Sequence, residues 1–361
     1  MKITRPTLLL DEKKCKENIG LVYKKAKKNN IDFRPHFKTH QSIEIGTWFK
    51  DIGVKKICVS SLEMAKYFAK QWNDITVAFP TNILEIDTIN ELSEKIQLNL
   101  LIESKETISF LKDHVKHKIG FFIKIDVGYN RTGINPNDIS LINSILEISK
   151  NSENIDFNGF LAHAGHTYKC RSKNEILAIH EKSKQLMLGL KALYIEAYPD
   201  LTLSLGDTPS CSVSEDFSGI NEIRPGNLVF YDLTQNQIGS NSIEQIAVAM
   251  ACPIVAIHKE RNEIITYGGS VHFSKDRLEN QAEGIIYGRA VEKKENGWGA
   301  IIPDIYVKSL SQEHGIVSVP STMIDNYKIG DYLMILPVHS CLTANLMKSY
   351  TTFEGKEISR F

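Results

Sequence analysis

The stretch IQLNLLIESKETISFLKDHVKHKIGFFIKID, residues 96–126, decides the fold class, because it places an amphipathic segment between two short apolar runs. The apolar runs at 96–102 and 120–126 have the length of buried strands, and residues 105–116 have helical spacing. Strands that alternate with helices are typical of a parallel sheet covered by helices. A protein of this class repeats the same unit along the chain.

The alternation continues through most of the first 235 residues. Further helices are expected at 11–29, 60–70, 83–95, 138–150 and 173–197. The expected strands are 31–38, 55–60, 74–80, 96–102, 120–126, 155–165, 201–207 and 227–232. Eight such strands favour a (β/α)8 TIM-like barrel, with a doubly wound open sheet as the alternative.

From about residue 240 the pattern changes to strand-like segments with no convincing helix between them. The longest is IAVAMACPIVAIHKERNEIITYGG, residues 246–269. This change predicts a second, mainly β domain. We therefore expect a barrel over residues 11–235 and a mainly β C-terminal domain over residues 236–361, to which residues 1–10 could add a strand.

Composition excludes several classes of protein. Lys plus Arg and Asp plus Glu both number 43, so no net charge recruits nucleic acid or an anionic membrane surface. The N-terminal apolar run is too short for a signal peptide, and no stretch is long enough to span a membrane. We expect a cytoplasmic enzyme for a small molecule. The six cysteines form no C-x-x-C pair, and all except Cys341 are expected to be reduced and buried.

Reactive residue types gather where the predicted strands end, and this end carries the active site in such barrels. The first strand ends in RPHFKTH (34–40) and the fifth in DVGYNRTG (126–133). The sixth ends in HAGHTY (163–168), the seventh in GDTPS (206–210), and the eighth in Tyr231-Asp232. The candidate active site is therefore the barrel mouth.

Lys38 lies at this mouth, among two histidines and an arginine. Nearby positive charge and partial burial would lower its pKa, as a Schiff-base lysine requires. GDTPS leaves the seventh strand, where barrels commonly bind phosphate. A lysine and a phosphate loop at one mouth together indicate pyridoxal phosphate as the cofactor. Taken singly, the lysine could be a solvated one and the loop a simple turn.

A second candidate site follows the apolar segment YLMILPV (332–338). If the strand continues, His339 and Cys341 point to the same side and could bind one ion. Nitrogen and sulfur ligands favour zinc, and two protein ligands leave room for water and substrate, as in a catalytic site. The alternative is a buried cysteine beside a histidine.

The motifs RPHFKTH, DVGYNRTG, HAGHTY, GDTPS, EIRPGNLVFYD (222–232) and HSCLTAN (339–345) resemble those of a known family. The family is the D-serine dehydratase and D-threonine aldolase group of fold-type III pyridoxal-phosphate enzymes, which are related to alanine racemase. The matching motifs extend from about residue 5 to residue 345. Their order and spacing make the resemblance specific, although each motif alone is weak.

The resemblance implies roles for particular residues. Lys38 would hold the cofactor as a Schiff base and act as the base at the substrate's α-carbon. The metal pair would be His339 and Cys341, with zinc or another divalent ion near the substrate's hydroxyl. The remaining cofactor-binding residues would be Arg131, Tyr168 and His163 around the ring, and Gly206, Asp207, Thr208 and Tyr231 at the phosphate.

Several alternatives stay open at this point. The same groups serve elimination of water and cleavage of the Cα–Cβ bond, so dehydratase and aldolase are both candidates. A racemase, a carrier that binds the cofactor without turnover, and a metal-free phosphosugar barrel are further alternatives. His272 departs from the family's Gly-Gly region, either as a surface histidine or in a different substrate pocket. Relatives suggest a homodimer.

Overall fold

The computed structural model describes residues 2–361, which form two compact units. One unit comprises residues 20–226 with Phe361, and the other comprises residues 2–19 with 227–360. The division falls inside the first helix, α1 (Glu12–Lys28). The predicted domains, 11–235 and 236–361 with 1–10, refer to function, and they stay a prediction because this division by contacts does not test them. None of the helices in residues 2–361 combines the length and apolar character needed to cross a membrane.

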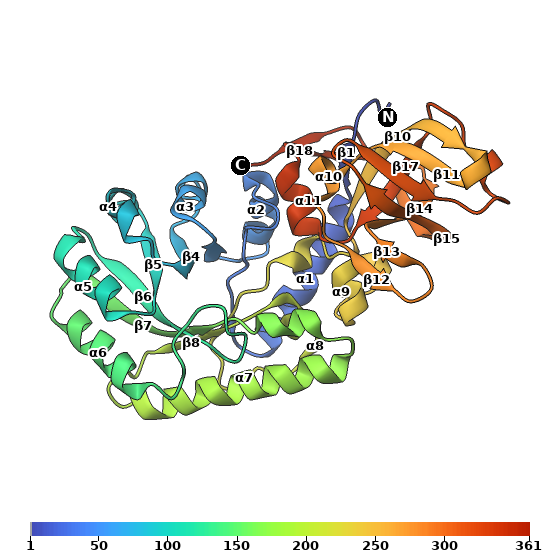
Figure 1. Cartoon of the computed structure of the whole chain (residues 1–361). Coiled ribbons are helices and arrows are strands. Elements are labelled where there is room, and N and C mark those ends of the chain that lie inside the picture. Colours follow the sequence, from blue (N-terminus) through green and yellow to red (C-terminus); the bar gives the residue numbers. More distant parts are fainter. Residues whose placement is uncertain (1) are drawn as a thin grey trace. The chain divides into compact units, whose positions relative to one another are not determined.

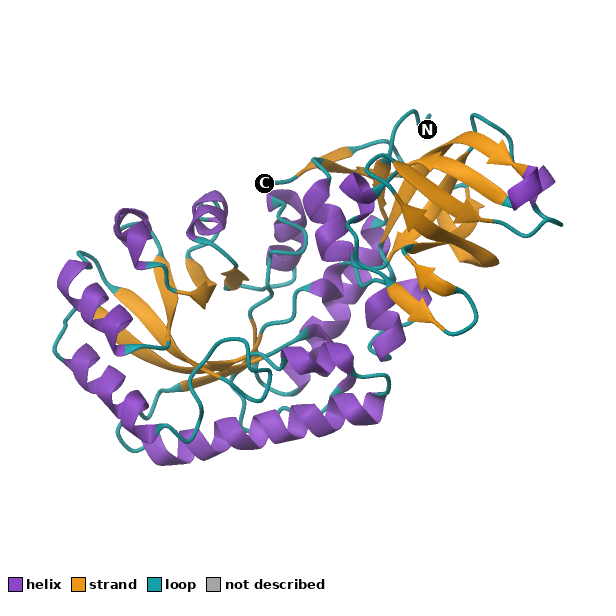
Figure 2. Cartoon of the chain, viewed as in Figure 1, coloured by secondary structure: helices purple, strands orange, loops and turns teal. Residues whose placement is uncertain are grey.

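Residues 20–226 contain a curled sheet of eight parallel strands (Figures 1 and 2). Just after the first strand, the chain forms an isolated bridge to the strand at the other end of the sheet, with backbone hydrogen bonds from Phe37 N to Cys58 O at 2.8 Å and from Cys58 N to Pro35 O at 2.9 Å. This closure confirms the predicted barrel and excludes the open sheet. In spatial order the strands are β2 (Asp32–Phe33), β9 (Glu222–Ile223), β8 (Thr202–Leu205), β7 (Ile155–Ala162), β6 (Ile119–Ile125), β5 (Gln97–Ile102), β4 (Asp74–Pro80) and β3 (Ile57–Val59).

Helices cover the outside of this sheet (Figure 2). The Ser61 and Ser104 hydroxyls and the Asp138 carboxylate each accept a backbone N–H three residues further on, which fixes where three of the helices begin. The short helices α2 and α8 were not predicted. The helices are α2 (Ile43–Asp51), α3 (Leu62–Phe68), α4 (Ile86–Ser93), α5 (Lys105–His114), α6 (Ile139–Lys150), α7 (Lys173–Tyr194) and α8 (Thr208–Val213).

The eighth barrel strand is not the one predicted. The apolar run 227–232 was expected to form it, but Asn227–Val229 is a single 3₁₀ turn, and β9 is formed by Glu222 and Ile223. A short apolar run does not distinguish a strand from another buried segment. β9 was missed because half of it is a buried carboxylate.

Polar side chains link several strands through the barrel interior. The Arg34 guanidinium donates from Nε to Glu222 Oε2 at 2.7 Å and from Nη1 to Asp74 Oδ1 at 2.6 Å. The amide of Asn99 donates to Asp74 Oδ1 at 3.0 Å, and that of Asn158 donates to Asn99 Oδ1 at 2.7 Å. Arg34 and Glu222 are both almost fully buried, and they join the first barrel strand to the eighth.

The other unit is built on a nine-stranded sheet in which six strands close into a second barrel, since β10 pairs with both β11 and β17. The N-terminal strand β1 (Thr7–Leu10) joins this sheet between β10 and β18, as the sequence allowed (Figure 1). The other strands are β10 (Val248–His258), β11 (Glu263–Tyr267), β14 (Gly288–Lys294), β15 (Gly297–Leu310), β16 (His314–Ser318), β17 (Tyr332–Pro337), β18 (Ser349–Thr352) and β19 (Glu357–Ser359), with a separate hairpin of β12 (Leu278–Asn280) and β13 (Gly284–Ile286).

Short helices interrupt this unit, where none was expected. They are α9 (Leu233–Ile238), α10 (Ser270–Phe273) and α11 (Ser340–Leu346). Each has seven residues or fewer, too short for a helical repeat of apolar residues to become visible in the sequence. α11 matters most, because it begins within the H-x-C motif.

The buried ion pair generates a prediction about stability. Replacing Glu222 with Gln should lower the free energy of unfolding by about 3–5 kcal/mol, because the Arg34 charge loses a buried partner. Urea unfolding followed by circular dichroism measures the change. The control is Glu91→Gln, which removes an exposed carboxylate that pairs with Lys66, and it should change the free energy of unfolding far less, because water screens an exposed pair. Equal losses in the two variants would contradict the prediction.

Candidate active site

Lys38 lies in the turn that follows the first barrel strand. The preceding residue, Phe37, is fully buried, and its ring packs 5.2 Å from that of Trp72 and 5.0 Å from that of Phe68. The Lys38 backbone N–H donates to His36 Nδ1 at 3.3 Å. The Lys38 side chain is exposed, so the expected partial burial is wrong. An anchored backbone thus presents an accessible amine at the mouth.

Arg131 lies in a loop that an aspartate shapes. Asp126 Oδ1 accepts the backbone N–H groups of Gly128 at 2.9 Å, Tyr129 at 2.9 Å and Asn130 at 3.1 Å. Asn130 has φ +57°, so the chain turns sharply there. The Arg131 guanidinium then lies over the Tyr129 ring, 4.9 Å from its centroid. The loop therefore fixes the direction of the guanidinium.

His163 follows β7 and meets the loop after β8. Its Nδ1 lies 2.9 Å from Gly206 O; a carbonyl only accepts, so Nδ1 carries the proton and donates it. Burial, reinforced by the charges of Lys124, Lys38 and Arg131, holds the pKa of His163 well below its usual value despite this bond. The neutral ring lies 6.0 Å from that of Tyr129 and 6.4 Å from that of Tyr168. His163 and Tyr168 thus belong to one aromatic group.

The predicted phosphate loop is closely packed. A Cβ on Gly206 would lie 2.6 Å from Arg224 N, so only glycine fits there. Asp207 Oδ1 caps α8 by accepting from Ser210 N at 2.8 Å, and it also accepts from Thr167 Oγ1 at 2.9 Å. The carboxylate therefore shapes the loop. Thr208 is buried in the first turn of α8.

Two buried bases in the barrel were missed by the sequence analysis. Lys124, on β6, is 5 % exposed; burial, with the charges of Arg224 and Arg131, lowers its pKa to about 7. Arg224, after β9, donates from Nη2 to Ala162 O at 2.5 Å. The lysine inside the apolar run GFFIKID could have indicated a buried charged residue, because such runs otherwise contain apolar side chains. Arg224 stood in a motif assigned to the mouth but received no role.

Basic groups therefore predominate at the ends of these strands. Burial, followed by the charges of Lys38, Arg224 and His163, holds the pKa of His36 well below its usual value. These basic groups repel one another, and a ligand with negative charge, such as a phosphate ester or a carboxylate, would offset that repulsion. The residues present thus fit a phosphorylated aldehyde cofactor, with Lys38 as the accessible amine.

The H-x-C pair lies in the unit of residues 227–360, and its local structure differs from the prediction. β17 ends at Pro337; His339 is the N-cap of α11, with extended φ −133° and ψ 100°, and Cys341 is in the first turn of the helix. The expected strand geometry is therefore wrong. Cys341 nevertheless helps to raise the pKa of His339, so the two side chains influence each other. A helix start brings them together instead.

Further polar groups surround this pair. His339 Nδ1 lies 2.6 Å from Asp276 Oδ2, and Asn227 Nδ2 donates to Cys341 Sγ at 3.4 Å. Burial lowers the pKa of His339, but Asp276 and Cys341 outweigh it and raise the value to about 11. Cys341 is half-buried and the other five cysteines are buried, as expected. An imidazole nitrogen and a thiol sulfur are donors that suit zinc.

No group of three or more His, Cys, Asp or Glu residues within 2–361 has the geometry to hold a metal. A metal at His339 and Cys341 would therefore take its other ligands from water or substrate, which is the arrangement of an open catalytic site.

Two more candidate residues belong to the same compact unit. Tyr231 is buried and has φ +49°. His272 accepts the Gly269 backbone N–H at Nδ1 at 3.2 Å and so holds the start of α10.

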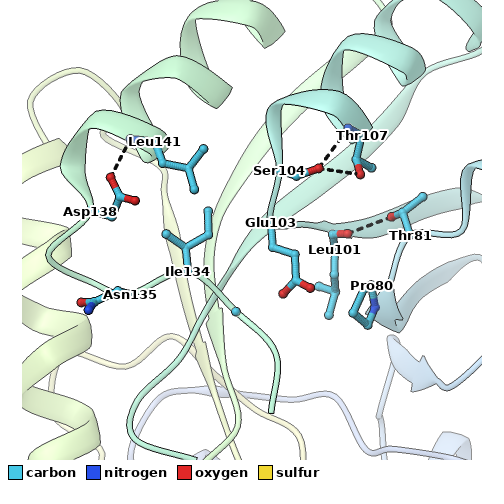
Figure 3. Close-up of a pocket in the computed structure, with 11 residues that line it drawn as sticks. Pro80, Thr81, Leu101, Glu103, Ser104, Thr107, Ile134, Asn135, Asp138 and Leu141 are labelled. Carbon is cyan, nitrogen blue, oxygen red and sulfur yellow. Dashed lines mark hydrogen bonds between the residues drawn. The ribbon is translucent and has the colours of Figure 1, made fainter. Parts of the chain in front are cut away.

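A cavity of about 500 Å³ opens at the ends of β4 and β5 and beyond β6 (Figure 3). Within the described residues, Glu103 Oε2 is buried there without a hydrogen-bond partner. None of the predicted site residues lines this cavity. Its lining residues are Pro80, Thr81, Leu101, Glu103, Ser104, Thr107, Gly133, Ile134, Asn135, Asp138 and Leu141.

Comparison with known proteins gives two family matches. Residues 10–233 match the family described as "Alanine racemase, N-terminal domain", and residues 247–353 match the one described as "Putative serine dehydratase domain". A D-serine dehydratase from Dictyostelium discoideum is 31% identical, over 96% of this chain and 93% of its own length. A D-threo-3-hydroxyaspartate dehydratase from Delftia sp. is 24% identical, over 97% and 94%. A solved structure of a D-threo-3-hydroxyaspartate dehydratase mutant, named as the metal-free form, has a TM-score of 0.91 at 22% identity, over 99% of this chain and 98% of its own.

The lowered pKa of Lys124 generates a prediction about pH. Between about pH 7 and 10.5 the unfolded chain holds a proton on Lys124 that the folded chain lacks, so this lysine destabilises the fold most at pH 7 and below. Lys124→Met should therefore raise the free energy of unfolding near pH 7 by a few kcal/mol. The gain should vanish as the pH approaches 10.5.

Urea unfolding of both proteins from pH 7 to pH 10 measures the difference. Lys105→Met, which removes an exposed lysine from the start of α5, is the matched control and should follow the wild type at each pH. A Lys124→Met gain that does not change with pH would contradict the prediction.

Proposed function

The chain belongs to the alanine racemase-like family that includes the D-serine dehydratases, and on that premise we propose that it is a pyridoxal-phosphate-dependent lyase for a β-hydroxy D-amino acid. The observation that carries the proposal is the accessible Lys38 amine, anchored at a barrel mouth where basic groups predominate. The names of both full-length relatives support it, since each is a D-amino-acid dehydratase.

In this proposal the barrel residues hold the cofactor and move one proton. When bound, the cofactor supplies an electron sink for the substrate's α-carbon. Lys38 would hold the cofactor at its aldehyde carbon, and its amine, freed when the substrate's amine takes its place, would accept the α-proton. Arg131, whose guanidinium lies over Tyr129 in the Asp126 loop, is proposed to contact the cofactor ring. His163 and Tyr168, whose rings are 6.4 Å apart, are proposed to line the same pocket.

Four further residues are proposed at the cofactor's phosphate. Gly206 and Thr208 supply backbone and hydroxyl donors, and Asp207 keeps their loop in shape by capping α8. Tyr231 is proposed as the fourth of these residues, on the resemblance of its motif EIRPGNLVFYD to the family's. The strain of its positive φ, in a bulky residue, is consistent with a functional position.

His339 and Cys341 are proposed to hold a divalent metal, with zinc favoured by the nitrogen and sulfur donors. Such an ion supplies a Lewis acid for the oxygen of a β-hydroxyl, which is a poor leaving group by itself. The Asp276 carboxylate and the Asn227 amide hold the two ligand side chains in place. A relative whose mutant is named as the metal-free form is consistent with a metal in this family.

Elimination is the favoured reaction. Loss of water from D-serine, followed by hydrolysis, yields pyruvate and ammonia. Cleavage of the Cα–Cβ bond would instead yield glycine and an aldehyde, and it needs a base for the β-hydroxyl. The names of the relatives favour the dehydratase. A racemase is the second candidate, because His339 or Cys341 could act as its second base.

We also propose that the protein is cytoplasmic and that it forms a homodimer. Light scattering measures the mass in solution and so tests the dimer.

A substrate assay tests the reaction. We expect keto-acid release from D-serine or D-threo-3-hydroxyaspartate, loss of activity after exhaustive chelation, and recovery when zinc is added back, because the β-oxygen needs a Lewis acid to leave. Keto acid, aldehyde and the opposite enantiomer are measured in parallel. Aldehyde release would replace the dehydratase with an aldolase, and enantiomer release alone would indicate a racemase. Undiminished activity after chelation would remove the metal from the proposal.

Borohydride reduction tests the lysine. We expect the reduced pyridoxyl group on Lys38, because its amine is accessible and its backbone is anchored. Peptide mapping by mass spectrometry locates the group. Lys124 is the internal control, because it is a second lysine of the barrel but is buried. Label on Lys124, or on neither lysine, would contradict the assignment. Lys38→Arg should lose the label and the visible absorbance of the bound cofactor.

A further inference from the structure

We propose that Asp276 is a positioning residue for the metal ligand His339, and that Asn227 has the matching role for Cys341. This inference rests on the proposed function, since it takes His339 and Cys341 as the metal pair. It concerns only residues of the compact unit that contains them. Asp276 accepts a hydrogen bond from the imidazole of His339, and Asn227 donates one to the sulfur of Cys341. Each of these hydrogen bonds favours the form of the side chain that binds a metal.

The histidine arm depends on one short hydrogen bond. His339 Nδ1 and Asp276 Oδ2 are 2.6 Å apart. An ionised carboxylate only accepts, so Nδ1 carries a proton, and Nε2 is the ring nitrogen that a metal would bind in place of its own proton. A carboxylate in this place fixes the tautomer and the ring orientation, and it strengthens the donor nitrogen.

The segment that carries Asp276 is itself tied to the helix of the ligands. Thr343, fully buried on α11, donates from Oγ1 to Phe273 O at 3.0 Å. Ser274 follows with φ +71°, an unfavourable conformation for a side chain other than glycine. The Asp276 backbone N–H then donates to Ser274 Oγ at 3.2 Å. The chain thus holds the carboxylate at a fixed place relative to α11.

The cysteine arm is buried. Asp232 Oδ2 accepts from Ser340 N at 3.0 Å and from Asn227 Nδ2 at 2.7 Å. These bonds orient the Asn227 amide. Its second N–H is directed at Ser340 Oγ, 3.0 Å from Nδ2, and at Cys341 Sγ, 3.4 Å from Nδ2. An N–H donor beside a thiolate withdraws electron density from sulfur, which favours the deprotonated ligand and tunes the bond to a metal.

Two other interpretations of Asp276 are less consistent with this arrangement. As a third metal ligand it would form a cluster with His339 and Cys341, but residues 2–361 contain no cluster of three such side chains with the geometry for a metal. As a plain surface ion pair it would resemble His258 and Glu260, whose atoms are 3.4 Å apart. The 2.6 Å distance between His339 Nδ1 and Asp276 Oδ2 is much shorter, as a charge-assisted hydrogen bond requires.

Zinc affinity measures the role of Asp276. The wild type, Asp276→Asn and Asp276→Glu compete with a chromogenic chelator for Zn²⁺, and Glu260→Gln is the matched control. We expect Asp276→Asn to weaken zinc binding by roughly 10–100-fold, because an amide can donate to Nδ1 and move the ring proton to Nε2. Asp276→Glu should recover part of the affinity, and Glu260→Gln should bind as the wild type does.

A spectroscopic measurement on the unaltered protein avoids any effect of substitutions on folding. In the zinc-loaded wild type, the long-range ¹⁵N–¹H spectrum of the His339 ring should show the Nδ1–H tautomer. The Nε2–H tautomer would overturn the inference. With Co²⁺ as the probe, Asn227→Ser should move the thiolate-to-cobalt absorption to lower energy, because the N–H donor to sulfur is lost; an unchanged band would overturn the role of Asn227.

The outcomes separate this inference from the proposed function. Equal zinc affinity in the wild type and Asp276→Asn overturns the role of Asp276 and leaves the lyase proposal intact. No zinc binding by the wild type, with borohydride label still on Lys38, overturns the metal pair and both positioning roles with it. Circular dichroism of each variant confirms that a lost affinity is not a lost fold.

Discussion

The hydrogen-bonded ion pair between Arg34 and Glu222 is the constraint on which the barrel depends. It joins the first strand to the last across a seam where β2 and β9 contribute only two residues each. A buried charge pair repays its desolvation only when every partner is present. Here the partners continue around the barrel through Asp74, Asn99 and Asn158. Gly120 lies between the two amides, where a Cβ would come within 2.3 Å of each.

This polar interior also connects to the barrel mouth. Ser204 Oγ donates to Glu222 Oε1, and the Arg224 guanidinium donates to Ser204 Oγ, both at 2.5 Å. The charges deep in the barrel thereby hold a base near the strand ends, where Lys38 and His163 lie. Each compact unit carries one part of the proposed chemistry: the barrel has the amine and the anion-binding groups, and the other unit has the metal pair. The amine can therefore be examined through the absorbance of the bound cofactor, and the metal pair through the absorption of bound Co²⁺.

Most of the fold was readable from apolar runs, because seven of the eight barrel strands fall within a predicted apolar run and several of the helices between them have ordinary caps. The exceptions share a cause. β9 was missed because a buried carboxylate replaced an apolar residue, and Lys124 because a lysine in an apolar run was not treated as functional. His339 and Cys341 were placed together for the wrong reason, since α11 gives no signal of its own in seven residues. Partners distant in sequence, such as Asp276, leave no local pattern.

The place of β1 has a consequence for how the chain is made. Thr7–Leu10 pairs with Val248–Ala251 on one side and with Thr351–Thr352 on the other. At about 5–20 residues per second, a ribosome needs on the order of tens of seconds to deliver the first of these partners. The barrel residues are all synthesised within that interval. An apolar segment made before the barrel must therefore wait, unpaired, while the barrel emerges, and the β sheet is completed only after β18 and β19 have been made.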